Sequence, residues 1–156
     1  RIVGNGLPRF TASLNNTFRY KNFDATIYFR GVFGFDIYNI HNCYYGVQGV
    51  SENVLKAAYK KNAHIKGGNI PCDYFIEPGD YIKLDVVTLG YTLKFASKWF
   101  DTLRFYLTGK NLATITKFSG VDPQSYPING LTPGATADRG YYPSTIQLLA
   151  GVQFHF

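Results

Sequence analysis

Two cysteines and two histidines are the residues of this chain with the most recognisable chemistry. Cys43 and Cys72 bound a segment of about 30 residues, and a disulfide between them would stabilise the fold by roughly 3–4 kcal/mol in the chain-entropy model. Such a bond needs an oxidising compartment, and two unpaired thiols are the alternative that the sequence leaves open. His41 and His64 lie near the cysteines in the sequence. The spacing of these four residues matches no standard zinc site, so we expect no metal.

Catalytic motifs are missing from the sequence. It has no nucleophile elbow, no paired-carboxylate spacing, no zinc-protease helix and no phosphate loop, and Gly4-Asn5-Gly6 indicates only a turn. The net charge of +6 arises from 16 Lys and Arg against 10 Asp and Glu. Because these cations are dispersed, apart from Lys60-Lys61, we expect no nucleic-acid partner. We therefore expect neither an enzyme nor a cofactor.

The composition favours a β-rich chain. The 13 Phe and 13 Tyr are strand formers and are also the residues that gather at membrane interfaces. Sixteen Gly and seven Pro supply turn chemistry. No apolar run approaches the roughly 20 residues of a membrane-spanning helix. These features together predict an all-β fold.

Polar and apolar residues alternate with a period of two in several segments, as they do in half-buried strands. The alternation over residues 10–20 resumes over residues 23–36 after the tight turn Lys21-Asn22, which predicts a hairpin. The remaining strands are predicted at about 80–93, 102–111 and 144–156.

Two long segments, residues 37–77 and 113–143, lack this alternation. The first could hold a short helix over residues 51–62, with Ser51 as its cap. In the strand that follows it, the pattern blurs beyond Val87, so a bulge or an interface position near Gly90 is expected.

Strand length and connection length distinguish a membrane barrel from a soluble β-sandwich. Strands of roughly 10–13 residues are longer than is usual in soluble sheets and match a tilted membrane crossing. The connections alternate between short and long, as in outer-membrane barrels with short periplasmic turns and long extracellular loops. About five strands cannot close a barrel, for which roughly eight are needed. The chain also begins with Arg1 and contains no Met, so we expect a fragment whose partner strands lie upstream.

In such a barrel, one face of each strand meets lipid and the other meets the wet interior. The predicted lipid-facing residues are Phe29, Phe33, Leu103, Leu107, Ile146, Leu148 and Val152. The predicted lumen-facing residues are Arg19, Tyr28, Arg30, Arg104, Tyr106 and Lys110. The lumen-facing residues either contact the solute or the plug domain, or they only form a wet, hydrogen-bonded wall of the barrel.

Several stretches resemble the SusC/RagA-like TonB-dependent outer-membrane transporters of the Bacteroidetes type. Residues 7–24 resemble a strand–turn–strand late in these transporters, and residues 77–93 resemble the strand that follows. The most specific stretch is residues 103–123, which contains Leu103-Arg104-Phe105-Tyr106. The resemblance covers nearly the whole chain, in the family's order.

This resemblance implies that residues 1–156 are the C-terminal portion of an antiparallel barrel of about 22 strands with a plugged lumen. It implies an outer-membrane protein in contact with lipid that imports oligosaccharides or peptides. The implied partners are a SusD-like surface lipoprotein and TonB, the latter through an N-terminal region outside this sequence. The resemblance does not account for Cys43 and Cys72. A soluble β-rich carbohydrate-binding module is the alternative from a different class.

The last strand is also expected to have a role in barrel assembly. Bacterial outer-membrane barrels commonly end in an alternating strand with a terminal aromatic residue. Until this strand meets the first strand, it presents an unpaired edge that must be recognised or protected. We expect this strand to act as a barrel-assembly signal. The alternative is that its phenylalanines only form part of the aromatic girdle at the membrane interface. The residues of the expected signal are Leu148, Val152, Phe154 and Phe156.

Overall fold

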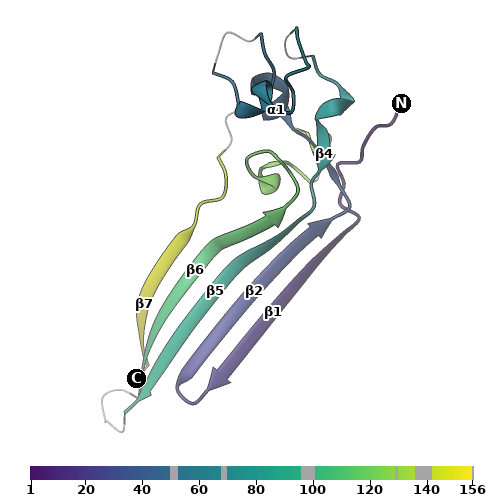
Figure 1. Cartoon of the computed structure of the whole chain (residues 1–156). Coiled ribbons are helices and arrows are strands. Elements are labelled where there is room, and N and C mark those ends of the chain that lie inside the picture. The colour runs from purple at the N-terminus through teal and green to yellow at the C-terminus, as the bar shows by residue number, and fades with distance from the viewer. Residues whose placement is uncertain (50–52, 68–69, 96–100, 129, 136–141, 156) are drawn as a thin grey trace. The chain divides into compact units, whose positions relative to one another are not determined.

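Five long strands form one sheet in the order β1-β2-β5-β6-β7 in the computed structural model, and Figure 1 shows that neighbouring strands run in opposite directions. The structure describes residues 1–49, 53–67, 70–95, 101–128, 130–135 and 142–155. The long strands are β1 (Phe10–Tyr20), β2 (Phe23–Phe33), β5 (Tyr81–Lys94), β6 (Thr102–Thr116) and β7 (Gln147–His155). The predicted all-β class and the antiparallel sheet of about five strands are confirmed.

The predicted strand positions are close to those observed. The first hairpin is confirmed: β1 and β2 are joined by Lys21 and Asn22, and Lys21 has a φ of 53°. The last strand is shorter than predicted, because it begins at Gln147. β6 is longer than predicted and runs on to Thr116. Asn111 adopts a φ of 55° within this strand, and this left-handed residue interrupts the alternation at the position where the sequence pattern ends.

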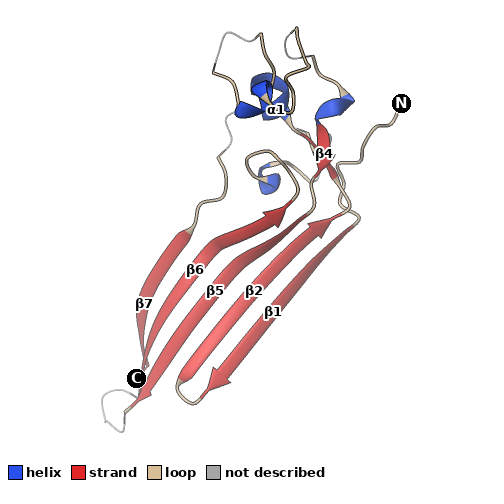
Figure 2. Cartoon of the chain, viewed as in Figure 1, coloured by secondary structure: helices blue, strands red, loops and turns tan. Residues whose placement is uncertain are grey.

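The first long connection contains structure that the sequence pattern did not reveal. Its elements are β3 (Asp36–Tyr38), α1 (Ile40–Tyr45), η1 (Lys56–Tyr59), η2 (Asp73–Phe75) and β4 (Ile76–Pro78). Figure 2 shows how short the helices are beside the strands.

The short helix that residues 51–62 could hold is a single 3₁₀ turn over part of this range in the described residues. This turn is η1, and the expected cap, Ser51, lies outside the described residues. The helix α1 begins earlier because the Asn39 side chain accepts a hydrogen bond from the backbone N–H of Asn42, at 3.0 Å. Within the described residues, no helix is long and apolar enough to cross a membrane. The second long connection contains the 3₁₀ turn η3 (Pro123–Ser125).

The chain divides into two compact units. The sheet unit comprises Thr11–Gly31, Ile82–Ile115 and Thr145–Phe156, and the loop unit comprises Arg1–Phe10, Val32–Tyr81 and Thr116–Ser144. The buried apolar clusters belong to the loop unit. One cluster consists of Val32, Phe35, Ile37, Tyr81, Phe118 and Tyr126, and the other is built around Cys43, Val47 and Phe75.

Candidate functional site

The two faces of the sheet unit differ in chemistry. In the β6–β7 pairing, Phe105 lies opposite Val152 and Leu107 lies opposite Ala150, so apolar residues share one face. The intervening positions, among them Arg104 opposite Gln153, share the other face. Side chains on successive residues of a strand point to opposite faces. The register therefore separates an apolar face from a polar face, as the alternation predicted.

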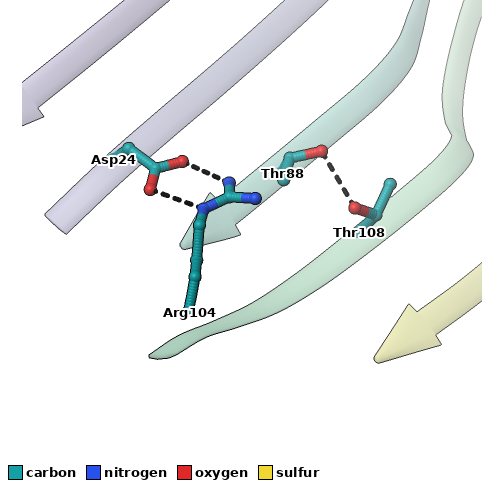
Figure 3. Close-up of polar contacts among 4 residues, drawn as sticks. All are labelled: Asp24, Thr88, Arg104 and Thr108. Atoms are coloured by element: carbon teal, nitrogen blue, oxygen red, sulfur yellow. Dashed lines mark hydrogen bonds and ion pairs between the residues drawn. The ribbon is translucent and has the colours of Figure 1, made fainter. Parts of the chain in front are cut away.

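An ion pair crosses the polar face between β2 and β6 (Figure 3). Arg104 donates from Nε to Asp24 Oδ1 at 3.0 Å and from Nη2 to Asp24 Oδ2 at 2.6 Å. This two-point geometry is the strongest that Arg and a carboxylate form. Both strands are neighbours of β5, so the pair passes over β5 at Gly90. A Cβ added to Gly90 would lie 2.7 Å from Arg104 Nη2 and would also strike the Asp24 carboxylate. Only glycine leaves room for this contact.

Two more polar contacts lie on the same face and define a shift in β5. Arg30 Nε lies 3.2 Å from Asp85 Oδ2. Thr88 and Thr108 share a hydrogen bond of 2.9 Å between their hydroxyls (Figure 3). Asp85 and Thr88 are three positions apart and would lie on opposite faces of a regular strand, yet both side chains lie on the polar face. One extra residue is therefore inserted at Val86–Val87, which is the property of a β-bulge. The expected bulge occurs slightly before the position near Gly90 that the sequence indicated.

The predicted lumen-facing residues Arg19, Tyr28, Arg30, Arg104, Tyr106 and Lys110 all fall on this polar face. The Arg104 guanidinium lies 5.5 Å from the centroid of the Tyr106 ring, within the range of a cation–π contact. The same ring covers Gly151 of β7, where any Cβ would collide with it. Arg19 lines a hollow together with Asp24 and Arg104. Tyr28 is half-buried, and Lys110 is exposed opposite Gln147.

The sequence interpretation did not identify the acidic partners of these arginines. The alternation had placed Asp24 and Asp85 on the polar face, and that was the available signal. It did not show that Asp24 would meet Arg104, 80 residues further along the chain. That this face lines a lumen stays a prediction.

The opposite face of the sheet unit exposes large apolar side chains. Phe18 is 59% exposed, Phe23 61% and Leu148 72%. Others on this face are Leu14, Leu89, Phe105, Leu107, Val152 and Phe154. Contiguous apolar patches of this kind mark surfaces that contact a membrane or another protein. Three of the four proposed assembly residues, Leu148, Val152 and Phe154, lie here, and Phe156 lies outside the described residues.

The two cysteines are free thiols in the structure, not a disulfide. Cys43 is fully buried in an apolar cluster with Val47 and Phe75, whereas Cys72 is exposed at the start of η2. The two sulfur atoms thus occupy different environments, and a bridge on oxidation stays a prediction. Burial raises the pKa of the Tyr38 hydroxyl beside this cluster. Among the described residues, no group of three or more His, Cys, Asp or Glu side chains could hold a metal ion.

A buried polar network in the loop unit was also missed from the sequence. Glu77 Oε1 accepts from Ser119 Oγ at 2.8 Å and from Asn39 Nδ2 at 3.3 Å, and Glu77 Oε2 accepts from the Ser119 backbone N–H at 2.8 Å. Asn42 Nδ2 lies 3.5 Å from Glu77 Oε1. Asn62 Nδ2 donates to Asn42 Oδ1 at 2.9 Å, which extends the network. Because Glu77 and Ser119 belong to different long connections, this carboxylate ties the two connections together.

Taken together, a sheet with one exposed apolar face and one ion-paired polar face defines a membrane-barrel type of wall. Comparison with known proteins agrees with this class. The chain is 28% identical over 172 residues to the TonB-dependent receptor P3 of Formosa agariphila, a match that covers 100% of this chain and 17% of that protein. It is 26% identical over 174 residues to the TonB-dependent receptor P26 of the same organism, covering 99% of this chain and 18% of that protein. The chain thus spans under one-fifth of these curated relatives. No family model matches it.

Solved structures show the same fold. The structure of the RagAB peptide transporter matches with a TM-score of 0.75 and 22% identity, over 97% of this chain and 17% of that chain. The RagAB peptide importer in its closed-closed state matches with a TM-score of 0.75 and 20% identity, over 100% of this chain and 18% of that chain. The predicted resemblance to the C-terminal part of SusC/RagA-like transporters is confirmed by these matches. The similarity to TonB-dependent receptors agrees with the predicted outer-membrane location.

Proposed function

We propose that residues 1–156 form the C-terminal portion of the barrel of a TonB-dependent outer-membrane importer. The supporting observation is the sheet unit, whose apolar face is exposed while its charges pair on the other face. In lipid every backbone polar group needs a partner, and the outer edges of β1 and β7 have none within this sheet. Further strands of the same protein would satisfy these edges and close the barrel. The plug domain would belong to that remaining part.

The cargo that we propose is a nutrient, either an oligosaccharide or a peptide, and not a substrate for catalysis. The two matched solved structures are described as a peptide transporter and a peptide importer, which supports the peptide alternative. We further propose a SusD-like surface lipoprotein as partner at the extracellular mouth, and TonB as the energy-coupling partner of the region beyond this chain. In this arrangement Arg19, Tyr28, Arg30, Arg104, Tyr106 and Lys110 face the lumen.

The competing function, a soluble carbohydrate-binding module, is disfavoured by the apolar face. A soluble protein would leave Phe18, Phe23 and Leu148 in water, where each exposed apolar side chain forgoes about 1.5–3 kcal/mol of burial. The test uses the full-length protein in its native host. We expect fractionation with the outer membrane, uptake of labelled oligosaccharides or peptides, and loss of uptake when TonB is removed. A protein that fractionates with the soluble periplasm and binds glycan unaided would contradict the proposal.

The proposed topology places both long connections outside the cell. A cysteine introduced by Lys60→Cys, in a Cys72→Ser background, should react with a membrane-impermeant maleimide on intact cells, because Lys60 is exposed. Labelling only after rupture of the outer membrane would invert the topology.

We also propose that the last strand acts as an assembly signal. Replacing Phe154 and Phe156 with Ser should slow insertion of the full-length protein in pulse-chase experiments, because the unpaired edge of the last strand must be recognised before closure. A normal insertion rate with a lower melting temperature would assign these residues to a girdle instead.

A further inference from the structure

The apolar face of the sheet unit is not uniformly filled. A groove with a volume of about 680 Å³ crosses it and is lined by residues from all five long strands. Ala25 and Ala150 are the small side chains in this groove, and the aromatic rings of Phe18, Phe23 and Phe105 also line it. Two alanines among large aromatic rings leave a depression that the described residues of this chain do not fill.

The lining of this groove suits a hydrocarbon chain. Asp24 is the acidic residue among its lining residues, and both of its carboxylate oxygens accept hydrogen bonds from Arg104. The Asp24 carboxylate therefore lies with Arg104 on the polar face of the sheet and places no charge among the apolar side chains of the groove. The remaining surface offers aromatic and aliphatic contacts, which favour a flexible apolar ligand over a sugar or a peptide.

A cation lies next to one of the lining residues of the groove. Tyr20 lines the groove, and the Lys21 ammonium lies 5.3 Å from the centroid of the Tyr20 ring. Lys21 is in the short turn between β1 and β2, so its charge lies beside the last residue of a membrane-crossing strand. Aromatic rings and lysines at such positions lie at headgroup level, where a lysine attracts anionic lipid.

We propose that this groove binds one acyl chain of an anionic glycerophospholipid whose phosphate is held by Lys21. The inference rests on the proposed function for the membrane location of the sheet. It commits to a phospholipid, not to lipopolysaccharide, because the groove lies toward the short turns, which the proposed topology places on the periplasmic side. A lipid held across β1, β2, β5, β6 and β7 would bridge five strands that are otherwise joined by backbone hydrogen bonds.

The test is native mass spectrometry of the full-length protein, purified from the outer membrane in detergent and then exposed to phosphatidylglycerol or phosphatidylethanolamine. We expect one phospholipid to stay bound under conditions that remove the others. Filling the groove by Ala150→Phe or Ala25→Leu should lower this retention about tenfold, since the loss of roughly two methylene contacts suffices for that factor. Ala12→Phe is the matched control, because Ala12 lies on the same face of β1 but does not line the groove. Lys21→Gln should remove the preference for phosphatidylglycerol, while Lys117→Gln, at an exposed site of the loop unit, should keep it.

Outer-membrane fractionation of each variant is measured first, which separates failure of this inference from failure of the proposed function. Equal phospholipid retention by the groove variants and the Ala12→Phe control would overturn the groove as a site. Retained lipopolysaccharide in place of phospholipid, or an unchanged headgroup preference in Lys21→Gln, would overturn the ligand assignment. If neither filling variant inserts, the comparison of Lys21→Gln with Lys117→Gln decides.

Discussion

Glu77 in the loop unit and Asp24 in the sheet unit are both carboxylates held by the fold, but their partners differ. Glu77 is only 9% exposed and is hydrogen bonded by neutral amides, a hydroxyl and a backbone N–H. Asp24 stays partly open to solvent and is paired with the Arg104 guanidinium. The loop unit thus resembles the interior of a soluble domain, with buried apolar clusters around a satisfied polar network. The sheet unit has instead a wet, charge-paired face and an apolar face left for its surroundings.

This difference means that polar groups in the two units respond differently to the loss of a partner. A buried group in the loop unit is stabilised only by other parts of the same chain, so removal of one partner leaves its neighbours unsatisfied. A group on the polar face of the sheet unit can replace a lost partner with water. The consequences of mutation should therefore be larger in the loop unit than at the ion pairs of the sheet unit.

The largest effect is expected from Glu77→Ala in the full-length protein. The change leaves the Asn39 amide and the Ser119 backbone N–H without their acceptor, and several unsatisfied buried donors together cost about 3–5 kcal/mol. Hydrogen exchange should then increase in residues 73–78 and 116–122. Asp73→Ala, at an exposed position, is the control. Unchanged exchange in both segments would show that Glu77 does not join the two connections.

A slightly smaller effect is expected from a charge on the apolar face of the sheet unit. Phe29→Arg should lower the free energy of unfolding in bilayers by about 2–4 kcal/mol, because a charge at the bilayer midplane is poorly solvated. Arg30→Phe, on the next residue of β2, places the change on the polar face and should be tolerated better. Equal losses from the two variants would argue against the assignment of faces.

The ion pair of the sheet unit should contribute less. Asp24→Asn and Arg104→Gln, measured singly and together, should give a coupling energy of about 0.5–1 kcal/mol, as for other solvent-accessible pairs. The side chains are 22% and 29% exposed, so water can take over part of the interaction. A coupling near zero would mean that the pair does not contribute to stability despite its short distances.

The smallest effect is expected at Cys72. Because its side chain is exposed and its thiol is free, Cys72→Ser should change stability by less than about 0.5 kcal/mol. Under reducing conditions a maleimide should react with Cys72 in the folded protein and with Cys43 only after unfolding. Loss of several kcal/mol on Cys72→Ser under oxidising conditions would instead reveal the disulfide that the sequence left open.

The sequence alone determined the long strands and their faces. Alternation over residues 10–20 predicted β1 to the residue, and alternation over residues 23–36 predicted β2 three residues too long at its end. It could do so because side chains on a strand point to opposite faces whatever their distant partners are. The same local rule placed Arg30 and Arg104 on one face. Strand lengths and the alternation of short and long connections were sufficient for the class of fold.

Only the tertiary structure decided which residues meet. The partner of Arg104 is 80 positions away in the chain, and the partner of Glu77 is 42 positions away. Contacts between residues so far apart in the sequence cannot be predicted from a periodic pattern. The exact position of the bulge in β5 also depended on the tertiary structure, because the sequence pattern only blurred beyond Val87. The helix α1 was not predicted, because it is only six residues long. Local alternation sets the direction of a side chain, whereas register and long-range packing set its partner, and these depend on the whole chain at once.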